Sequence, residues 1–160
     1  MDPEKLTLLK AEIQSQTAVI ESIYAKLDER GRGKTRAALE SVGYQLHNLY
    51  CAFEDLFKMV AHAFENQIED KSQYHMELLR RMSISIQGVR PALFSHESYL
   101  LLDNLRSFRH FFRHAYSYEL DPRKVSIVMQ DAGKLRSRYR KDIQAFLRDL
   151  TEGRKLKGAR

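Results

Sequence analysis

Basic and imidazole side chains gather on one face of a segment in the last third of the sequence. With a helical advance of about 100° per residue, they lie opposite the apolar side chains of the same segment. The set is Arg106, Arg109, His110, Arg113, His114 and the phenol Tyr116. Residues 105–118 contain three arginines and no acid, so the cations repel one another at spacings of three and four. This pattern indicates an anionic partner; the alternative is a solvated helix face on which Asp103 pairs with Arg106.

Arginine and histidine without a nearby acid suit the cleavage of RNA. A neutral imidazole can accept the proton of a ribose 2′-OH, and an imidazolium can protonate the leaving 5′ oxygen. Arginine binds the phosphate through two donors and stabilises the charge of the transition state. Because the 2′-OH is an internal nucleophile, this chemistry requires no metal ion and no other cofactor.

Two of the histidines are also spaced for metal binding. His110 and His114 are four residues apart, so they could share an ion if His96, His75 or Asp103 supplied a third ligand. The sequence contains no HExxH motif, and the neighbouring arginines disfavour a cation. We therefore expect no metal site.

Helical periodicity extends over almost the whole chain. Asp-Pro pairs at residues 2–3 and 121–122 are typical helix starts, and glycines at 31 and 33 are typical helix ends. Apolar spacings of three, four and seven predict five helices. Their approximate ranges are 3–30, 34–66, 72–86, 95–118 and 122–150. We expect an all-α, single-domain bundle of four or five helices over residues 1–150, followed by a basic tail at 151–160.

Composition and charge narrow the class of protein. The chain has 160 residues, of which 43% are apolar, which suffices for one domain with a core. The single cysteine, Cys51, excludes an internal disulfide and is expected in the core. With no signal peptide or membrane span in the pattern, we predict a cytoplasmic protein.

The charge is divided unevenly along the chain. Residues 1–70 carry 8 basic and 12 acidic side chains, whereas residues 71–160 carry 19 and 9. Such a basic half is typical of proteins with a polyanionic partner. A further basic cluster on the last helix either extends a surface for RNA or is a solvated face. Its members are Arg136, Arg138, Arg140 and Lys141.

Residues 109–116, RHFFRHAY, match the pattern R-x4-H-x-Y. The chain resembles the HEPN superfamily, and most closely its HepT-like toxins, over about residues 1–150. The resemblance implies an all-α ribonuclease toxin, acting on tRNA or mRNA, paired with a nucleotidyltransferase antitoxin of the MNT type. It assigns phosphate binding to Arg109, acid–base catalysis to His114 and AMPylation by the antitoxin to Tyr116. His110 stands where the family often has Asn, which leaves its role open.

Spacing places a constraint on such a site. Arg109 and His114 are five residues apart, so they point about 140° apart on an ideal helix. A kink or a second chain would be needed to bring them to one phosphate, unless Arg106 or Arg113 supplies the cation within one chain. The resemblance to the HEPN superfamily implies the second chain, since in that superfamily two motifs meet across a homodimer interface. We therefore expect a homodimer here.

Two other classes of function fit part of the pattern. A non-catalytic helical adaptor that binds a nucleotidyltransferase would form a stable complex and turn over no RNA. A nucleic-acid-binding or chaperone-like bundle would bind RNA in a salt-dependent way without needing His114.

Overall fold

The computed structural model describes residues 1–65 and 74–157 and confirms the all-α prediction over those ranges. The five α-helices are α1 Pro3–Arg30, α2 Arg36–Phe64, α3 Tyr74–Met82, α4 His96–Arg113 and α5 Pro122–Lys157. A 3₁₀ turn, η1 (Ala115–Ser117), follows α4, and an isolated bridge pairs Ile86 with Arg90. No described helix is both long enough and apolar enough to cross a membrane.

Helix starts follow the capping residues in the sequence. The Asp2 carboxylate accepts a hydrogen bond from the backbone N–H of Glu4 at 3.2 Å, and Pro3 opens α1. Thr35 caps α2, and Ser95 caps α4 through the N–H of Ser98 at 3.3 Å. These bonds fix where α1, α2 and α4 begin. The last helix continues past the predicted end at residue 150 to Lys157.

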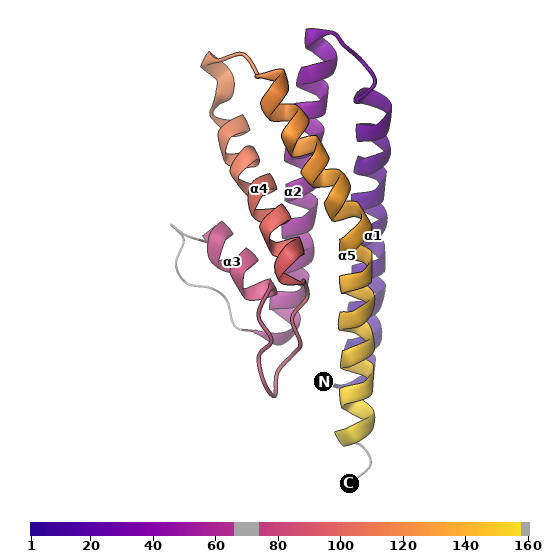
Figure 1. Ribbon diagram of the computed structural model, residues 1–160. Coiled ribbons are helices and arrows are strands. Elements are labelled where there is room, and N and C mark those ends of the chain that lie inside the picture. The colour runs from indigo at the N-terminus through magenta and orange to yellow at the C-terminus, as the bar shows by residue number, and fades with distance from the viewer. Residues whose placement is uncertain (66–73, 158–160) are drawn as a thin grey trace.

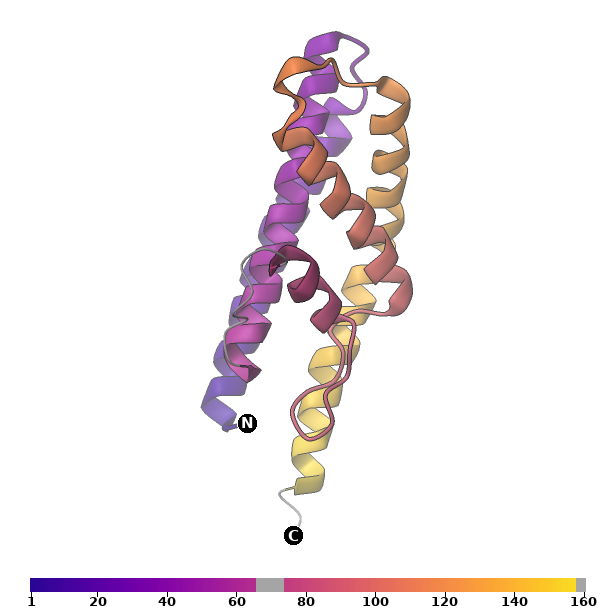
Figure 2. The ribbon, with the colours of Figure 1, turned by 90° about the vertical axis from the view of Figure 1, so that its left-hand side faces the viewer.

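Helices α1 and α2 form an antiparallel hairpin, and α5 packs beside it (Figure 1). Helix α4 crosses between α2 and α5, while the short α3 covers the lower part of α2 and α4 (Figure 2). The start of α1 and the described end of α5 lie at the end of the bundle opposite the α4–α5 connection (Figure 1). The third helix, predicted over 72–86, ends earlier than expected, at Met82, after which the chain forms a loop; its predicted start at 72–73 lies outside the described residues.

Aromatic side chains fill the centre of the bundle. Phe53 on α2 is fully buried and meets the ring of Tyr139 on α5 edge-on, with 5.2 Å between the centroids. The Tyr139 hydroxyl donates a hydrogen bond to the Glu21 carboxylate on α1. Tyr139 therefore joins α5 to both helices of the hairpin.

Ion pairs within the bundle engage most of the basic cluster on α5. Arg136 lies 2.8 Å from Asp28, Arg140 pairs with Glu21, and Arg138 pairs with Glu97. The acidic first half and the basic second half of the chain are thus partly neutralised against each other. Of the two interpretations of this cluster, these pairs favour a solvated helix face, with its arginines bound to carboxylates of other helices, over a free surface for RNA.

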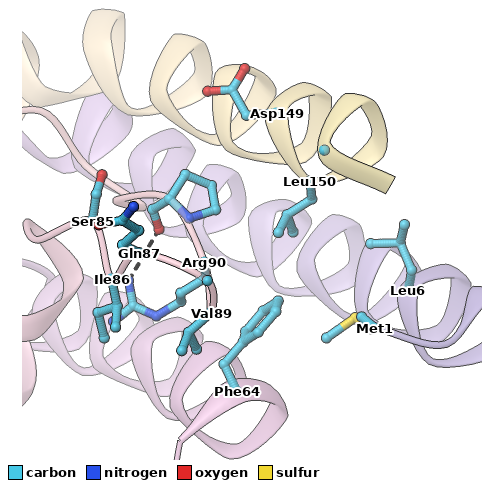
Figure 3. Close-up of a pocket in the computed structure, with 13 residues that line it drawn as sticks. Met1, Leu6, Phe64, Ser85, Ile86, Gln87, Val89, Arg90, Asp149 and Leu150 are labelled. Carbon is cyan, nitrogen blue, oxygen red and sulfur yellow. Dashed lines mark hydrogen bonds between the residues drawn. The ribbon is translucent and has the colours of Figure 1, made fainter. Parts of the chain in front are cut away.

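A buried ion pair closes the lower end of the bundle. The Arg90 side chain, 0% exposed, donates from Nε to the Glu65 carboxylate at 2.7 Å, and Glu65 is 7% exposed. Arg90 also donates to the carbonyls of Ile84, Pro91 and Arg81 at 3.0–3.1 Å. Beside it lies a cavity of about 750 Å³ that is mostly apolar, with Phe64 and Leu150 in its wall (Figure 3). Arg90 therefore fastens the loop after α3 to the end of α2.

Candidate active site

The end of α4 is where the structure departs most from the prediction. The helix was expected to reach Tyr118, but it stops at Arg113, and His114 is its C-cap. Leu120 is 7% exposed, and a Cβ on Gly43 of α2 would lie only 2.9 Å from it and 3.0 Å from Phe112. The chain must bend after Arg113 to bring Leu120 into this close contact, and a straight helix would carry it away.

This bend changes how the candidate residues are distributed. The prediction that one helix face holds all three arginines, both histidines and Tyr116 is wrong, because His114 and Tyr116 lie beyond the last residue of α4. Phe111, one of the apolar side chains of this segment, is 38% exposed and not part of a buried face. The structure sorts the candidates into a part that faces α2 and a part beside the α4–α5 connection.

Arg109 faces α2. Its Nε donates to the sulphur of Cys51 at 3.3 Å, and the same sulphur lies 3.7 Å from Nε2 of His47. No described carboxylate lies within ion-pair distance of Arg109. Among the described residues, its two terminal nitrogens also make no hydrogen bond. These nitrogens are the donors with which arginine binds a phosphate.

His47 is an imidazole that the sequence analysis did not assign to the site. Its ring packs against Phe112, with 5.7 Å between the centroids, and its Nδ1 is buried without a hydrogen-bond partner. Burial lowers the pKa of His47 below the ordinary imidazole value, and the positive charges of Arg109 and Arg113 lower that pKa further. His47 is therefore neutral at pH 7.

The remaining arginines differ from Arg109. Arg106 is 19% exposed and pairs with Asp103, at 2.8 Å between Nη2 and Oδ1, as the solvated-face alternative anticipated. Arg113 is exposed, lies close enough to His47 to lower its pKa, and has no carboxylate partner in the described part of the chain. The cations facing α2 that keep their charge uncompensated are thus Arg109 and Arg113.

His110 and His114 lie together beside the α4–α5 connection. Their rings meet edge-on with 5.0 Å between the centroids, and both side chains are exposed. They line an open depression of about 660 Å³ together with Phe111, Tyr118, Glu119, Asp121 and Lys124. Among the described residues no hydrogen bond joins His114 to Arg109. Within one chain, Arg109 thus contacts α2, whereas His114 lines the depression beside the α4–α5 connection.

Tyr116 is the most accessible of the candidates. It lies in η1 and is 91% exposed, so a second protein can reach its hydroxyl. Tyr118, two residues later, is 67% exposed but lines the depression beside His114.

The possible third ligands for a metal at His110 and His114 are occupied elsewhere. His75 lies 2.7 Å from the Glu54 carboxylate, His96 stacks on Tyr99, and Asp103 holds Arg106. Within the described ranges no three His, Cys, Asp or Glu side chains are placed to share an ion.

Two side chains of the site, His47 and Cys51, went unrecognised in the sequence. They are four residues apart on α2 and so share one face of that helix. That spacing was the available signal, but it became informative only once α4 was placed against this face.

Comparison with known proteins shows to which family the chain belongs. The model of the family described as HepT-like protein matches residues 41–150, which is more than half of the chain and includes most of α2, all of α4 and the motif at 109–116. Neither the curated proteins nor the solved structures include a match to this chain. The match confirms the resemblance based on the motif, and the chain belongs to the HepT-like family of the HEPN superfamily.

Proposed function

We propose that this protein is a metal-independent endoribonuclease toxin that cleaves tRNA or mRNA. The observation that carries the proposal is Arg109, which is held by its Nε and has no acidic partner among the described residues, in a motif whose histidine is exposed. The family match supports the toxin class. RNA and the ATP used by an antitoxin are both found in the cytoplasm, where we place this activity.

The proposed reaction needs only the groups of the motif and the RNA. His114 takes the proton of the 2′-OH, whose oxygen attacks the adjacent phosphorus. The bond from phosphorus to the 5′ oxygen breaks, and that oxygen receives a proton from an imidazolium. Arg109 binds the non-bridging oxygens and stabilises their growing charge. The products are a 2′,3′-cyclic phosphate and a 5′-hydroxyl end.

A homodimer completes this site. Arg109 contacts α2, whereas His114 follows the end of α4 and lines a different depression, so we propose that the two groups act on one phosphate from two chains. Two copies related by a two-fold axis can place Arg109 of one beside His114 of the other. His110, Arg106 and Arg113 then line the same cleft as RNA-binding groups.

The first experiment tests the chemistry with substrates alone. In EDTA, the purified protein should cut bulk tRNA or an unstructured RNA into fragments with cyclic phosphate ends. It should leave a 2′-O-methyl RNA and a DNA of the same sequence intact, because neither offers a 2′-OH. Cutting of the 2′-O-methyl RNA would contradict the mechanism. No cutting of any RNA, together with a stable nucleotidyltransferase complex, would favour the adaptor alternative.

Tyr116 is the proposed site of neutralisation by an MNT-type antitoxin. Its phenolic oxygen attacks the α-phosphorus of ATP and forms a bond to it, while the bond from the α-phosphorus to the bridging oxygen breaks and pyrophosphate leaves. The phenolic proton passes to the antitoxin. The AMP adds negative charge three residues from Arg113, and we propose that in the dimer cleft it competes with RNA for the arginines.

We expect co-expression with such an antitoxin to raise the intact mass of the protein by one or more AMP units and to abolish cleavage. The Tyr116→Phe variant should keep its mass and its activity under the same conditions, while Tyr118→Phe should still be modified. A modified protein that cuts RNA at the full rate would contradict this role of Tyr116.

A further inference from the structure

Two side chains of α2, Cys51 and His47, connect that helix to Arg109, the arginine of the motif. Nε of Arg109 donates to the Cys51 sulphur at 3.3 Å, and that sulphur lies within hydrogen-bonding reach of His47 at 3.7 Å. The ring of His47 is in turn packed on Phe112, one turn from Arg109 on α4. We propose that Cys51 and His47 are positioning residues, which hold the Arg109 guanidinium by its Nε and present its two terminal nitrogens to the RNA phosphate.

The chemistry of sulphur suits this role. A carboxylate in the place of Cys51 would accept two parallel hydrogen bonds from the guanidinium and would compete with the phosphate for the same donors. The cysteine sulphur is a weak acceptor, and here it engages the Nε alone. The arginine is thereby oriented while its charge and its terminal nitrogens remain available.

His47 suits the role because it is neutral. A protonated imidazole here would add a third positive charge beside Arg109 and Arg113 and would place a buried N–H where no acceptor lies. The neutral ring contacts the Cys51 sulphur through Nε2 and does not repel the positive charges of Arg109 and Arg113. Both of its nitrogens are turned into the protein or toward the sulphur, so His47 acts through Arg109 and not on the RNA itself.

The inference rests on the proposed function only for what Arg109 does; the contact between the three side chains is tested without RNA. We expect nuclear magnetic resonance titration to give His47 a pKa below the ordinary imidazole value. That pKa should rise in Arg109→Gln, because one facing positive charge is lost. The matched variant Arg148→Gln, at an exposed position on α5, should leave it unchanged. The groups that face His47 are Arg109 and Arg113 from α4 and Cys51 from its own helix. An unchanged pKa of His47 in Arg109→Gln would overturn the proposed arrangement of Arg109, Cys51 and His47, here called the relay.

The second arm measures what the relay does for RNA. Cys51→Ala should lower kcat by about ten- to a hundred-fold with a smaller change in KM, because a misdirected guanidinium still attracts RNA but stabilises the transition state poorly. Cys51→Ser keeps an acceptor at this position and should recover most of the loss, which a general packing defect would not show. Equal rates for wild type and Cys51→Ala would overturn the positioning role.

Failure of the proposed function gives a different pattern. If the wild-type protein cuts no RNA, the endonuclease proposal fails, and the relay is judged by binding of a 2′-O-methyl oligonucleotide. Weaker binding by Cys51→Ala than by Cys51→Ser would still support oriented phosphate binding by Arg109. Equal binding by both variants would overturn it.

Discussion

Mixing two inactive variants of this protein should restore RNA cleavage. Arg109→Ala removes the group that stabilises the phosphate charge and should lower the rate by about 10²–10³-fold. His114→Ala removes the acid–base group and should lower it by about 10²–10⁴-fold. A mixed dimer keeps Arg109 in one chain and His114 in the other, so it has one complete composite site.

The mixture needs the two chains to exchange, after which about half of the dimers are mixed. Cleavage should then recover to within several-fold of the wild-type rate. The matched control mixes Arg109→Ala with the double variant Arg109→Ala/His114→Ala, whose dimers never contain Arg109. Mixed dimers that form, as measured by mass spectrometry, and remain inactive would show that the site lies within one chain.

Removing the buried arginine at the other end of the bundle should lower the free energy of unfolding strongly. Arg90→Ala leaves the carboxylate of Glu65, 7% exposed, without the hydrogen bonds from the guanidinium, although Arg81 still contacts it at 3.1 Å. The carbonyls of Ile84 and Pro91 in the loop after α3, and that of Arg81 in α3 itself, lose their donor as well. Breaking one side of a buried ion pair lowers the free energy of unfolding by about 3–5 kcal/mol, which urea denaturation would measure.

Two further variants isolate the cause of that loss. Arg80→Ala removes an arginine that is 55% exposed and paired with Glu77, and it should cost about 0–1 kcal/mol. Adding Glu65→Gln to Arg90→Ala should recover part of the loss, because no buried charge is then left without its main partner. A loss of under 1 kcal/mol in Arg90→Ala would contradict the importance of the pair.

Local chemistry in the sequence predicted much of the fold. The start of α1 at Asp2-Pro3 and its end at Gly31 follow from capping alone, and no distant residue is needed to place them. The end of α4 could not be predicted in this way, since neither glycine nor proline follows Arg113. It depends on Leu120 packing against Gly43, more than 70 positions earlier in the chain, and such contacts leave no local pattern.

The candidate site was predictable to a similar degree. Arg109 and His114 were recognisable because a short motif carries them, and the motif led to the family. His47 and Cys51 lie on a helix with ordinary apolar periodicity, where a histidine and a cysteine look like core residues. Their contact with Arg109 arises from the crossing of α4 over α2, which the sequence of neither helix specifies.

The positions of the two chain ends have a practical consequence. The start of α1 and the described end of α5 lie at the far end of the bundle from the α4–α5 connection (Figure 1), to which His114 and Tyr116 belong. Fluorescent proteins or affinity tags can therefore be fused to either end without covering that surface. Energy transfer between differently labelled copies would then test the proposed homodimer in living cells.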